Sequence, residues 1–187
     1  MKTERKLLLL VAVILTFGFT ERFLSSCKTD KMKTDLIVSS NAFADSAFIP
    51  AKYTCDAENI SPAISWSKGP DSTKTYALIC DDPDAPSKVW VHWVLFNIPA
   101  TVTSISENQP TEKIILTSAI NGNNDFGTLG YSGPCPPKGI HHYCFKVYAL
   151  DCSLSLGAGA TKEEVVSAMK NHILAEGQLT GKYQRSK

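Results

Sequence analysis

The chain has 187 residues, 43% of them hydrophobic and 20% charged, and a formal net charge of +1. This composition leaves enough apolar side chains for one sizeable core, so a single globular domain is expected. The sequence contains no basic stripe and no segment in which arginine alternates with aromatic residues. Nucleic acid is therefore not an expected partner.

Residues 1–26 predict a signal peptide. Lys2, Arg5 and Lys6 precede an apolar run that begins at Leu7, which is the layout of a secretory signal. The run is shorter than the roughly 20 apolar residues that a membrane-spanning helix needs, so an uncleaved N-terminal anchor is the weaker alternative. Removal of this segment takes away four basic and two acidic residues and changes the formal charge from +1 to −1.

The end of this segment predicts a lipid anchor. Leu24-Ser25-Ser26-Cys27 is similar to a bacterial lipobox, after which Cys27 would become the new N-terminus and receive acyl chains. Acyl chains gain about 0.8 kcal/mol per buried CH₂, so several of them hold a soluble domain at a membrane surface. Glu21 and Arg22 lie between the apolar run and the cleavage point. Such charges are unusual there, and plain secretion stays open.

The segment that follows Cys27 predicts a tether. Residues 27–36 are short and mostly polar, and they precede the domain expected at 37–187. Together these features predict a membrane-anchored lipoprotein of the bacterial cell envelope. A soluble periplasmic or secreted protein is the alternative.

The six cysteines predict neither a zinc ribbon nor a disulfide-dense scaffold, because they show no CxxC pair and no regular spacing. Cys80 and Cys144 lie in apolar runs and are expected to be buried as small hydrophobic side chains. Cys55 and Cys135 lie in loop sequence and could pair in an oxidising compartment, but spacing alone does not establish a disulfide. The pattern among these four and Cys152 stays open.

Most of the chain has the alternation typical of β-strands. Runs rich in β-branched and aromatic residues occupy 76–80, 89–98, 114–116 and 143–150. Turn signals at 69–71, 99–100, 121–124 and 134–137 separate them. This pattern predicts a mainly β sandwich with long loops.

One segment, near residues 162–176, predicts a helix. Thr161 is followed three residues later by Glu164, which is the pattern of a capping box. Apolar residues then recur at a spacing of three to four as far as Ile173, and Gly177 would end the helix.

His92 is expected inside the sheet. Alternation along its strand places it on one face with Trp90, Val94 and Phe96, and both faces are apolar. A buried imidazole needs a hydrogen-bond partner, and Asp82, at the end of the preceding strand, is the expected one. The alternative is a histidine with only a structural role in the core.

A proline-rich loop leads into the strand that carries the next histidines. Alternation places His141 and Tyr143 on one face of this strand and His142 on the other. The prolines stiffen the loop, and Gly133 allows backbone to approach a bound group closely. A rigid loop beside a histidine suits a small binding pocket, although a simple corner of the chain is the alternative.

These two regions resemble the phosphatidylethanolamine-binding protein family, in particular its bacterial Raf-kinase-inhibitor-like branch. The resemblance rests on Asp82-Pro83-Asp84-Ala85-Pro86 with His92, and on the stretch from Gly133 to Tyr143. Segments 53–56, 59–62, 124–127 and 148–151 agree with it, and it extends from Ile37 to Tyr183. It implies a large antiparallel sheet packed on a smaller one, with few helices.

The resemblance also implies an anion-binding pocket. The positions that match are Asp82, Pro86, His92, Gly133, His141 and Tyr143, and we add Pro134 as part of the rim. His142 stands where many relatives carry an arginine. If that arginine braces the pocket loop through a carboxylate, His142 is expected to replace it only when protonated.

The predicted function is binding of a small anionic or phosphorylated ligand, of the phospholipid head-group type, without its chemical transformation. Asp82 would orient, His92 and His141 would donate hydrogen bonds, and Tyr143 would add a hydroxyl. Binding is expected to be tighter below the histidine pKa, which is about 6.5 when unperturbed. No cofactor and no metal are expected, and the natural ligand and oligomeric state stay open.

An enzyme is not expected. Gly130-Tyr131-Ser132-Gly133 superficially resembles a nucleophile motif, but the prolines that follow exclude the helix N-terminus that a nucleophile elbow needs. Two alternatives remain. One is a protein-interaction module that modulates a partner, in the manner of a kinase or protease inhibitor. The other is a metal site built from His92, His141 and a carboxylate or Cys135.

Overall fold

The computed structural model describes residues 34–185. The predicted signal peptide, Cys27 and most of the tether lie outside the described residues. Within them, a large sheet has the strand order β1 (Thr34–Asp35), β10 (Ile173–Tyr183), β9 (His141–Leu150), β4 (Thr75–Asp82), β5 (Trp90–Pro99), β8 (Ala119–Asn121) and β7 (Ile114–Ile115). A small sheet has the order β2 (Val38–Ser39), β3 (Ile64–Trp66) and β6 (Ser104–Ile105).

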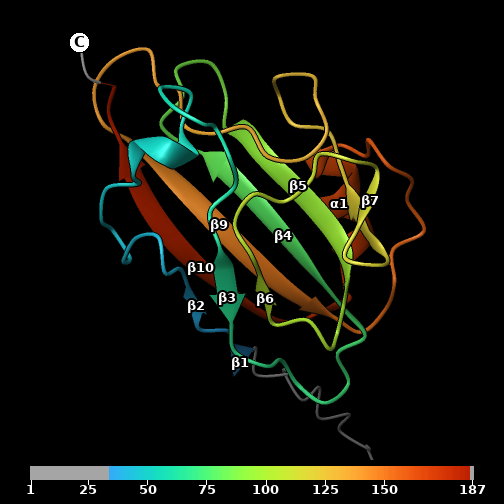
Figure 1. Ribbon diagram of the computed structural model, residues 1–187. Coiled ribbons are helices and arrows are strands. Elements are labelled where there is room, and N and C mark those ends of the chain that lie inside the picture. Colours follow the sequence, from blue (N-terminus) through green and yellow to red (C-terminus); the bar gives the residue numbers. More distant parts are fainter. Residues whose placement is uncertain (1–33, 186–187) are drawn as a thin grey trace, which may run out of the picture. The chain divides into compact units, whose positions relative to one another are not determined.

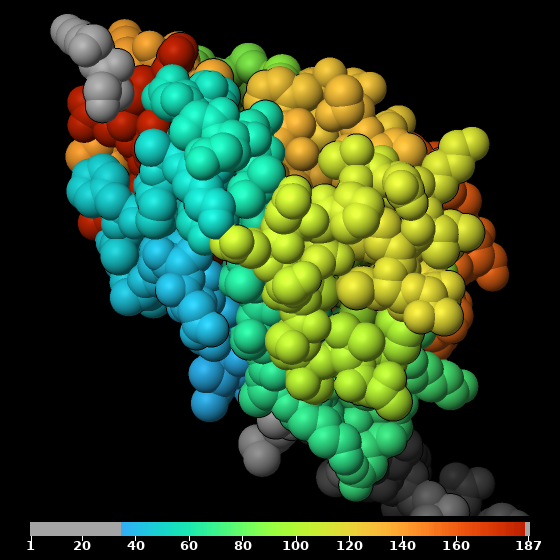
Figure 2. Space-filling model, in the orientation of Figure 1, coloured from blue at the N-terminus to red at the C-terminus, as the bar shows by residue number. Residues whose placement is uncertain are grey.

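The predicted fold class is confirmed. Both sheets are antiparallel except that the short β1 pairs with β10 in parallel. The small sheet lies in front of the large one in Figure 1. In the same orientation, Figure 2 shows that cyan and yellow-green segments cover the long strands on this side. Two short helical elements, η1 (Ala51–Tyr53) and α1 (Lys162–Met169), complete the described part of the chain.

The large sheet separates two hydrophobic cores. Trp93, Phe145 and Leu78 pack toward the small sheet, together with Trp66 of β3. Val94, Phe96 and Ile79 pack on the opposite face with Val165 and Met169 of α1. Every residue of β4 is buried, as expected for a central strand that is covered on both faces. Polar side chains at the end of this strand are therefore costly unless they have partners.

The helix is shorter than the sequence pattern predicts. Its capping box is confirmed, because Thr161 Oγ1 accepts a hydrogen bond from the Glu164 N–H and Glu164 Oε2 accepts one from the Thr161 N–H. The prediction of helix up to residue 176 is wrong. Asn171, with φ at 69°, redirects the chain, and β10 begins at Ile173. The apolar residues beyond Met169 thus belong to a strand whose pairing partners lie far away in the sequence.

Gly177 has a different role from the expected helix stop. It lies within β10, where the backbone of Leu36 passes so closely that a Cβ at this position would overlap the Leu36 carbonyl oxygen. The Leu36 N–H donates to the Glu176 carbonyl at 2.8 Å. Leu36 is buried, so the last residues of the expected tether take part in the sheet and its core. No helix within residues 34–185 is long and apolar enough to span a membrane.

Candidate functional site

The end of β4 supplies a buried carboxylate. Asp82 is the last residue of this strand and is only 3% exposed. Its Oδ1 accepts a hydrogen bond of 2.8 Å from the Asp84 N–H, as in an Asx-turn. This local bond fixes the carboxylate and leaves Oδ2 for a partner on the neighbouring strand.

That partner is His141, the first residue of β9. His141 Nδ1 lies 2.7 Å from Asp82 Oδ2, and both side chains are less than a tenth exposed. A carboxylate oxygen accepts, so Nδ1 carries the proton of this hydrogen bond. The bond fixes the orientation of the ring, and Nε2 is left as the ring nitrogen available to a ligand.

An irregularity in β5 places His92. Cys80 of β4 pairs with Trp93, but the next residue, Asp81, pairs with Val91, so His92 is an extra residue in its strand. Such a β-bulge re-aims a side chain. It brings His92 to the face between the two sheets.

The contact of His92 with Tyr143 shows this placement. The two rings meet edge to face, with their centroids 5.1 Å apart, and Tyr143 belongs to the core between the sheets. The expectation that His92 shares a face with Val94 and Phe96 is therefore wrong, because these two pack in the core beneath α1.

The hydrogen-bond partner of His92 also differs from the expected one. Its Nδ1 lies 2.6 Å from the Ser132 carbonyl oxygen, whereas both oxygens of Asp82 are engaged by His141 and Asp84. A carbonyl oxygen only accepts, so Nδ1 is the protonated nitrogen and Nε2 is available. Burial lowers the pKa of His92, although the Ser132 carbonyl and the charge of Asp82 oppose this shift.

Both histidines line a cavity of about 270 Å³, near the lower end of the sizes usual for ligand pockets. Its walls are mostly apolar, and an aromatic edge is formed by Phe126, whose ring centroid lies 5.4 Å from that of His92 and 5.6 Å from that of Trp90. The lining residues are Asp82, Ala85, Pro86, Ser87, Trp90, His92, Phe126, Cys135, Pro136, Pro137, His141 and Tyr143. A few buried polar groups in apolar walls are typical of a small-molecule site.

The hydroxyl of Tyr143 is the unsatisfied polar group of this cavity. The residue is fully buried, and its hydroxyl makes no hydrogen bond of acceptable geometry within residues 34–185. Burial and then the nearby charge of Asp82 raise the pKa of Tyr143, which keeps its proton. A buried hydroxyl without a partner is costly, and a ligand or water in the cavity could satisfy it.

Five of the seven predicted pocket residues line this cavity, but Gly133 and Pro134 do not. The Gly133 N–H donates to Asn59 Oδ1 at 2.8 Å, and a Cβ here would overlap the Tyr53 carbonyl oxygen. The Pro134 carbonyl accepts from the Cys55 N–H at 3.1 Å. These two residues thus fasten the loop to a distant segment, and the cavity wall itself comes from the next three residues, Cys135, Pro136 and Pro137.

A disulfide fastens the same loop. Cys55 and Cys135 are joined with their Cα atoms 5.4 Å apart, a pairing that the sequence left open. The cysteines Cys80 and Cys144 are buried as expected, and Cys152 is also a free thiol. Because Cys135 is in a disulfide, it offers no thiolate to the alternative metal site. Among the described residues, the donor atoms of His92 and His141 do not converge with a third ligand either.

The outer side of the site is braced by a second carboxylate and histidine. Asp84 Oδ2 accepts hydrogen bonds from the backbone N–H of His142 at 2.8 Å and from its Nδ1 at 2.6 Å. The hydrogen bond from His142 lowers the pKa of Asp84, although burial opposes this shift. A neutral imidazole that carries its proton on Nδ1 can also donate this hydrogen bond. His142 can therefore brace the loop without the positive charge that we expected it to need.

Sequence reasoning missed the aromatic edge and the Ser132 carbonyl. Phe126 lies in a loop held by Asp125, whose Oδ2 accepts from the Val91 N–H at 2.7 Å. Asn124 fixes the other side of this loop, because its Oδ1 accepts from the Phe126 N–H at 3.0 Å and its Nδ2 contacts Ser132 Oγ at 3.1 Å. The only sequence signal was the match of segment 124–127 to the family pattern.

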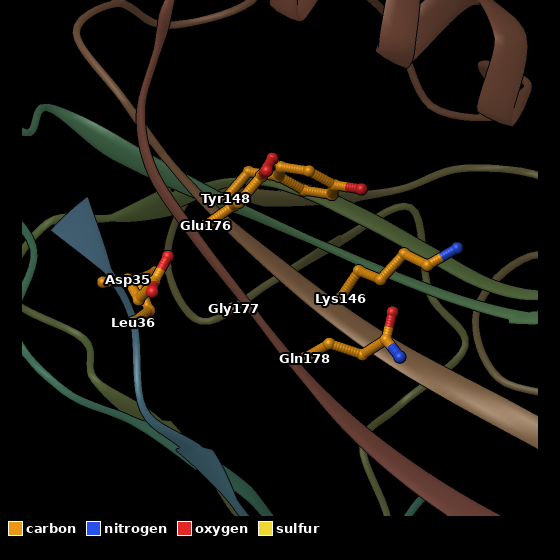
Figure 3. A pocket seen from close by; sticks show the side chains of 7 residues that line it. All are labelled: Asp35, Leu36, Lys146, Tyr148, Glu176, Gly177 and Gln178. Carbon is orange, nitrogen blue, oxygen red and sulfur yellow. The ribbon is translucent and has the colours of Figure 1, made fainter. Parts of the chain in front are cut away.

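A second hollow, of about 440 Å³, lies over the outer face of β9 and β10 (Figure 3). It is lined by Asp35, Leu36, Lys146, Tyr148, Glu176, Gly177 and Gln178. Lys146 is the only cation in this lining, and its Nζ contacts the Asp81 carboxylate at 2.8 and 3.0 Å. The acidic residues Asp35 and Glu176 also line this hollow, and the charge of Lys146 is already paired, so the hollow does not suit an anion. The smaller cavity lined by the two histidines is therefore the better candidate site.

The fold and the site define a two-sheet β-protein with a small histidine-lined cavity at one end of its large sheet. A sequence model of the phosphatidylethanolamine-binding protein family matches residues 39–184, and the chain belongs to this family. The expected resemblance is thereby confirmed.

Relatives and solved structures agree. The chain is 54% identical over 148 residues to a UPF0098 protein of Methanothermobacter thermautotrophicus, an alignment that covers 79% of this chain and 98% of the relative. The crystal structure of a phosphatidylethanolamine-binding protein homolog from Chlamydia trachomatis, CT736, is similar with a TM-score of 0.75 and 38% identity, covering 81% of this chain and 99% of that one. E. coli YbcL is similar with a TM-score of 0.76 and 34% identity, covering 82% and 100%.

Proposed function

We propose that this domain binds a small phosphate-bearing anion, of the phospholipid head-group type, between His92 and His141 and releases it unchanged. The observation that carries the proposal is that the two imidazole rings are held in the same way. In each, Nδ1 is tied to an acceptor, Ser132 O or Asp82 Oδ2, and Nε2 remains available in a common cavity. Two such nitrogens can converge on the oxygens of one anion.

The Tyr143 hydroxyl supports this proposal. It is a buried donor that makes no hydrogen bond of acceptable geometry within residues 34–185, although the Asp82 carboxylate lies nearby. Burial keeps it protonated by raising its pKa. An anionic oxygen in the cavity would satisfy it. Because leaving such a group unpaired costs about 1–3 kcal/mol, its satisfaction would add to the binding free energy.

The size and edge of the cavity favour a head group over a whole lipid. A volume of about 270 Å³ admits a phosphate with a short substituent and is too small for acyl chains. The rings of Trp90 and Phe126 at the aromatic edge could face the ammonium of an ethanolamine group through cation–π contacts.

Binding without catalysis is part of the proposal. The backbone carbonyl of Ser132 accepts the hydrogen bond from His92. The side-chain hydroxyl of Ser132 instead contacts Asn124 Nδ2 at 3.1 Å. Ser132 therefore does not present its hydroxyl to His92 in the manner of a nucleophile beside its base. The role we assign to the histidines is that of hydrogen-bond donors.

We place the domain at the outer side of a bacterial membrane, held by acyl chains on Cys27. The disulfide between Cys55 and Cys135 supports export, because such bonds persist mainly in oxidising compartments. Phe126 and Ile140 lie beside or within the cavity lining and are each close to half exposed. Exposed apolar side chains near the mouth of the site suit a ligand that projects from a membrane surface.

The test is titration calorimetry of the full chain with inorganic phosphate and with O-phosphoethanolamine, at pH 5.5 and pH 8. We expect saturable binding that is tighter at the lower pH and is lost in His141→Gln. His172→Gln is the matched control, because His172 also pairs with an aspartate at 2.7 Å but lies outside the cavity lining. Absence of binding by the folded wild-type chain, or equal loss in both variants, would overturn the proposal.

A further inference from the structure

The far end of β9 brings together three side chains that the anion pocket does not use. Asp151 and Cys152 directly follow β9, and His172 directly precedes β10. The two strands are neighbours, with Leu150 paired to Ile173. Antiparallel pairing thus places the two segments side by side even though residues 153–171, which include α1, separate them in the sequence.

Backbone hydrogen bonds hold both segments. The Asp151 N–H donates to the His172 carbonyl at 3.1 Å, and the His172 N–H donates to the Met169 carbonyl at 2.9 Å. The Cys152 carbonyl accepts from Thr75 Oγ1 at 2.6 Å. The three side chains therefore project from backbone that is already fixed, as a metal site requires.

The side-chain donor atoms converge. One ligand atom from each of Asp151, Cys152 and His172 lies within 4.8 Å of the others. Within residues 34–185, this is the one group of three or more histidine, cysteine or acidic side chains that converges closely enough to hold a metal ion. His172 Nδ1 and Asp151 Oδ1 are 2.7 Å apart. Cys152 is a free thiol, whereas Cys55 and Cys135 are consumed by their disulfide.

We propose that Asp151, Cys152 and His172 form a binding site for a divalent transition-metal ion of the zinc class. A thiolate, an imidazole and a carboxylate are the ligand types that Zn²⁺ prefers, and three protein ligands leave a fourth tetrahedral position for water. The soft thiolate selects against Mg²⁺ and Ca²⁺, which prefer oxygen ligands only. Since Asp151 and His172 are 36% and 46% exposed at the side chain, the ion can enter directly from solvent.

Binding has a defined proton balance. The Cys152 thiol forms a bond from sulfur to the metal and releases its proton to solvent, while Asp151 gives an electron pair from a carboxylate oxygen. The neutral imidazole of His172 gives an electron pair from one ring nitrogen and keeps its single proton on the other.

This site is separate from the proposed anion pocket. His141 begins β9 and Asp151 follows its last residue, so about 30 Å of strand lies between the two sites at roughly 3.3 Å per residue. The metal proposal consequently does not depend on the proposed function, and each can fail without the other.

Co²⁺ is a suitable probe, because a cobalt–thiolate bond gives a charge-transfer absorption band that oxygen and nitrogen ligands do not. The full chain, purified without thiol reductant so that the disulfide stays intact, is titrated with Co²⁺ and then with Zn²⁺ as competitor. We expect a band that saturates at one Co²⁺ per chain and is displaced by Zn²⁺. It should disappear in Cys152→Ser and weaken at least tenfold in affinity in His172→Gln and Asp151→Asn.

His142→Gln is the matched control, since His142 pairs with Asp84 at 2.6 Å in the same way but has no cysteine in a convergent group. It should leave the band unchanged. No band with the folded wild-type chain would overturn the proposal, and so would a band that persists in Cys152→Ser. Circular dichroism of each variant ensures that loss of the band is not loss of the fold.

Discussion

Asp82 and His141 lie on adjacent strands and share a hydrogen bond of 2.7 Å between Oδ2 and Nδ1, with both side chains buried. The other oxygen of Asp82 is held by the Asp84 N–H. The carboxylate is therefore fixed at both oxygens, and the ring it orients has one defined nitrogen for a ligand. This arrangement makes Asp82 a positioning residue whose removal should affect binding through His141.

Asp82→Asn should weaken phosphate binding by at least about tenfold, since a hydrogen bond to a charged group is worth about 1.5–3 kcal/mol. Titration calorimetry measures the loss. The control is Asp71→Asn, because that side chain is 97% exposed and pairs with the surface residue Lys68. An affinity within twofold of wild type in Asp82→Asn would contradict the role assigned to the carboxylate.

The buried His92 predicts a dependence of stability on pH. Burial lowers its pKa in the folded protein, whereas the unfolded chain has a value of about 6.5. Below that pH the unfolded chain binds more protons than the folded one, so the free energy of unfolding should fall as the pH drops from 6.5 through the lower folded-state pKa. Urea denaturation of wild type and His92→Gln at several pH values tests this, and the variant should lack this contribution.

The same shift refines the expected pH dependence of binding. A proton on Nε2 of His92 is needed for donation to an anion, and the lowered pKa moves its gain below the unperturbed 6.5. Phosphate should therefore raise the titration midpoint of His92, observed by NMR of the ring. A midpoint that does not move when phosphate saturates the pocket would show that His92 does not donate to it.

The Asp84–His142 brace should be worth less than the buried pair. Both side chains are more than 40% exposed, so His142→Ala should lower the free energy of unfolding by less than about 1 kcal/mol. Asp84→Ala should cost more, because it also removes the acceptor of the His142 backbone N–H.

The pKa of Asp84 gives the sign of a pH effect on this brace. The hydrogen bond from His142 lowers it in the folded state. The stabilisation is therefore present above the unfolded value of about 3.9 and is lost as the pH falls through the folded value. The free energy of unfolding of the wild type should show this loss at acid pH, whereas that of the Asp84→Ala variant should not.

Asp81 holds α1 to the sheet and should be important for stability. Its carboxylate is fully buried and contacts Lys146 of β9 and Lys162 of α1. Asp81→Asn should lower the free energy of unfolding by about 2–4 kcal/mol, somewhat less than for a fully buried pair because both lysines can turn to solvent. Lys162→Met is the comparison, and it should cost less because Lys146 still pairs with the carboxylate. Equal urea midpoints for Asp81→Asn and wild type would contradict this account.

The disulfide should stabilise both the fold and the pocket wall. It joins cysteines 80 residues apart, and Cys135 lines the cavity. The double variant Cys55→Ala/Cys135→Ala should lose about 2–4 kcal/mol of stability. It should also bind phosphate more weakly, even at temperatures where circular dichroism shows it fully folded. Unchanged phosphate affinity in the folded variant would mean that Gly133 and Pro134 alone hold the wall.

The sequence predicted the long strands β4, β5 and β9 because each is an apolar run bounded by turn residues. It failed at β10, where Gly177 and Gly181 interrupt the pattern for reasons that lie elsewhere in the chain. Their missing side chains make room for Leu36 and for Ile49 and Phe43. Such close approaches depend on tertiary packing and leave no local signal.

For the candidate site, the sequence indicated the two histidines and the aspartate, but only part of their orientations and hydrogen-bond partners. Alternation correctly placed His141 with Tyr143, since β9 is regular where it pairs with β4 and β10. It misplaced His92, because a bulge has no signature in a strand of apolar residues. The Ser132 carbonyl was missed since any residue can supply a backbone acceptor, and so the partner of a buried histidine cannot be derived from side chains alone.

The bulge at His92 has a consequence for how strands of this kind can vary in length. Because His92 is the residue without a partner in β4 at this bulge, deleting it would remove the bulge, while the other register shift of this strand pair, between Tyr76 and Leu78, would remain. It would also remove the His92 carbonyl that accepts from the Ser132 N–H at 2.9 Å, so the cavity would lose one wall and one bond that holds the neighbouring loop. Substitution and deletion of His92 are therefore different changes. Substitution alters the side chain that lines the cavity, whereas deletion removes the bulged backbone position that carries it.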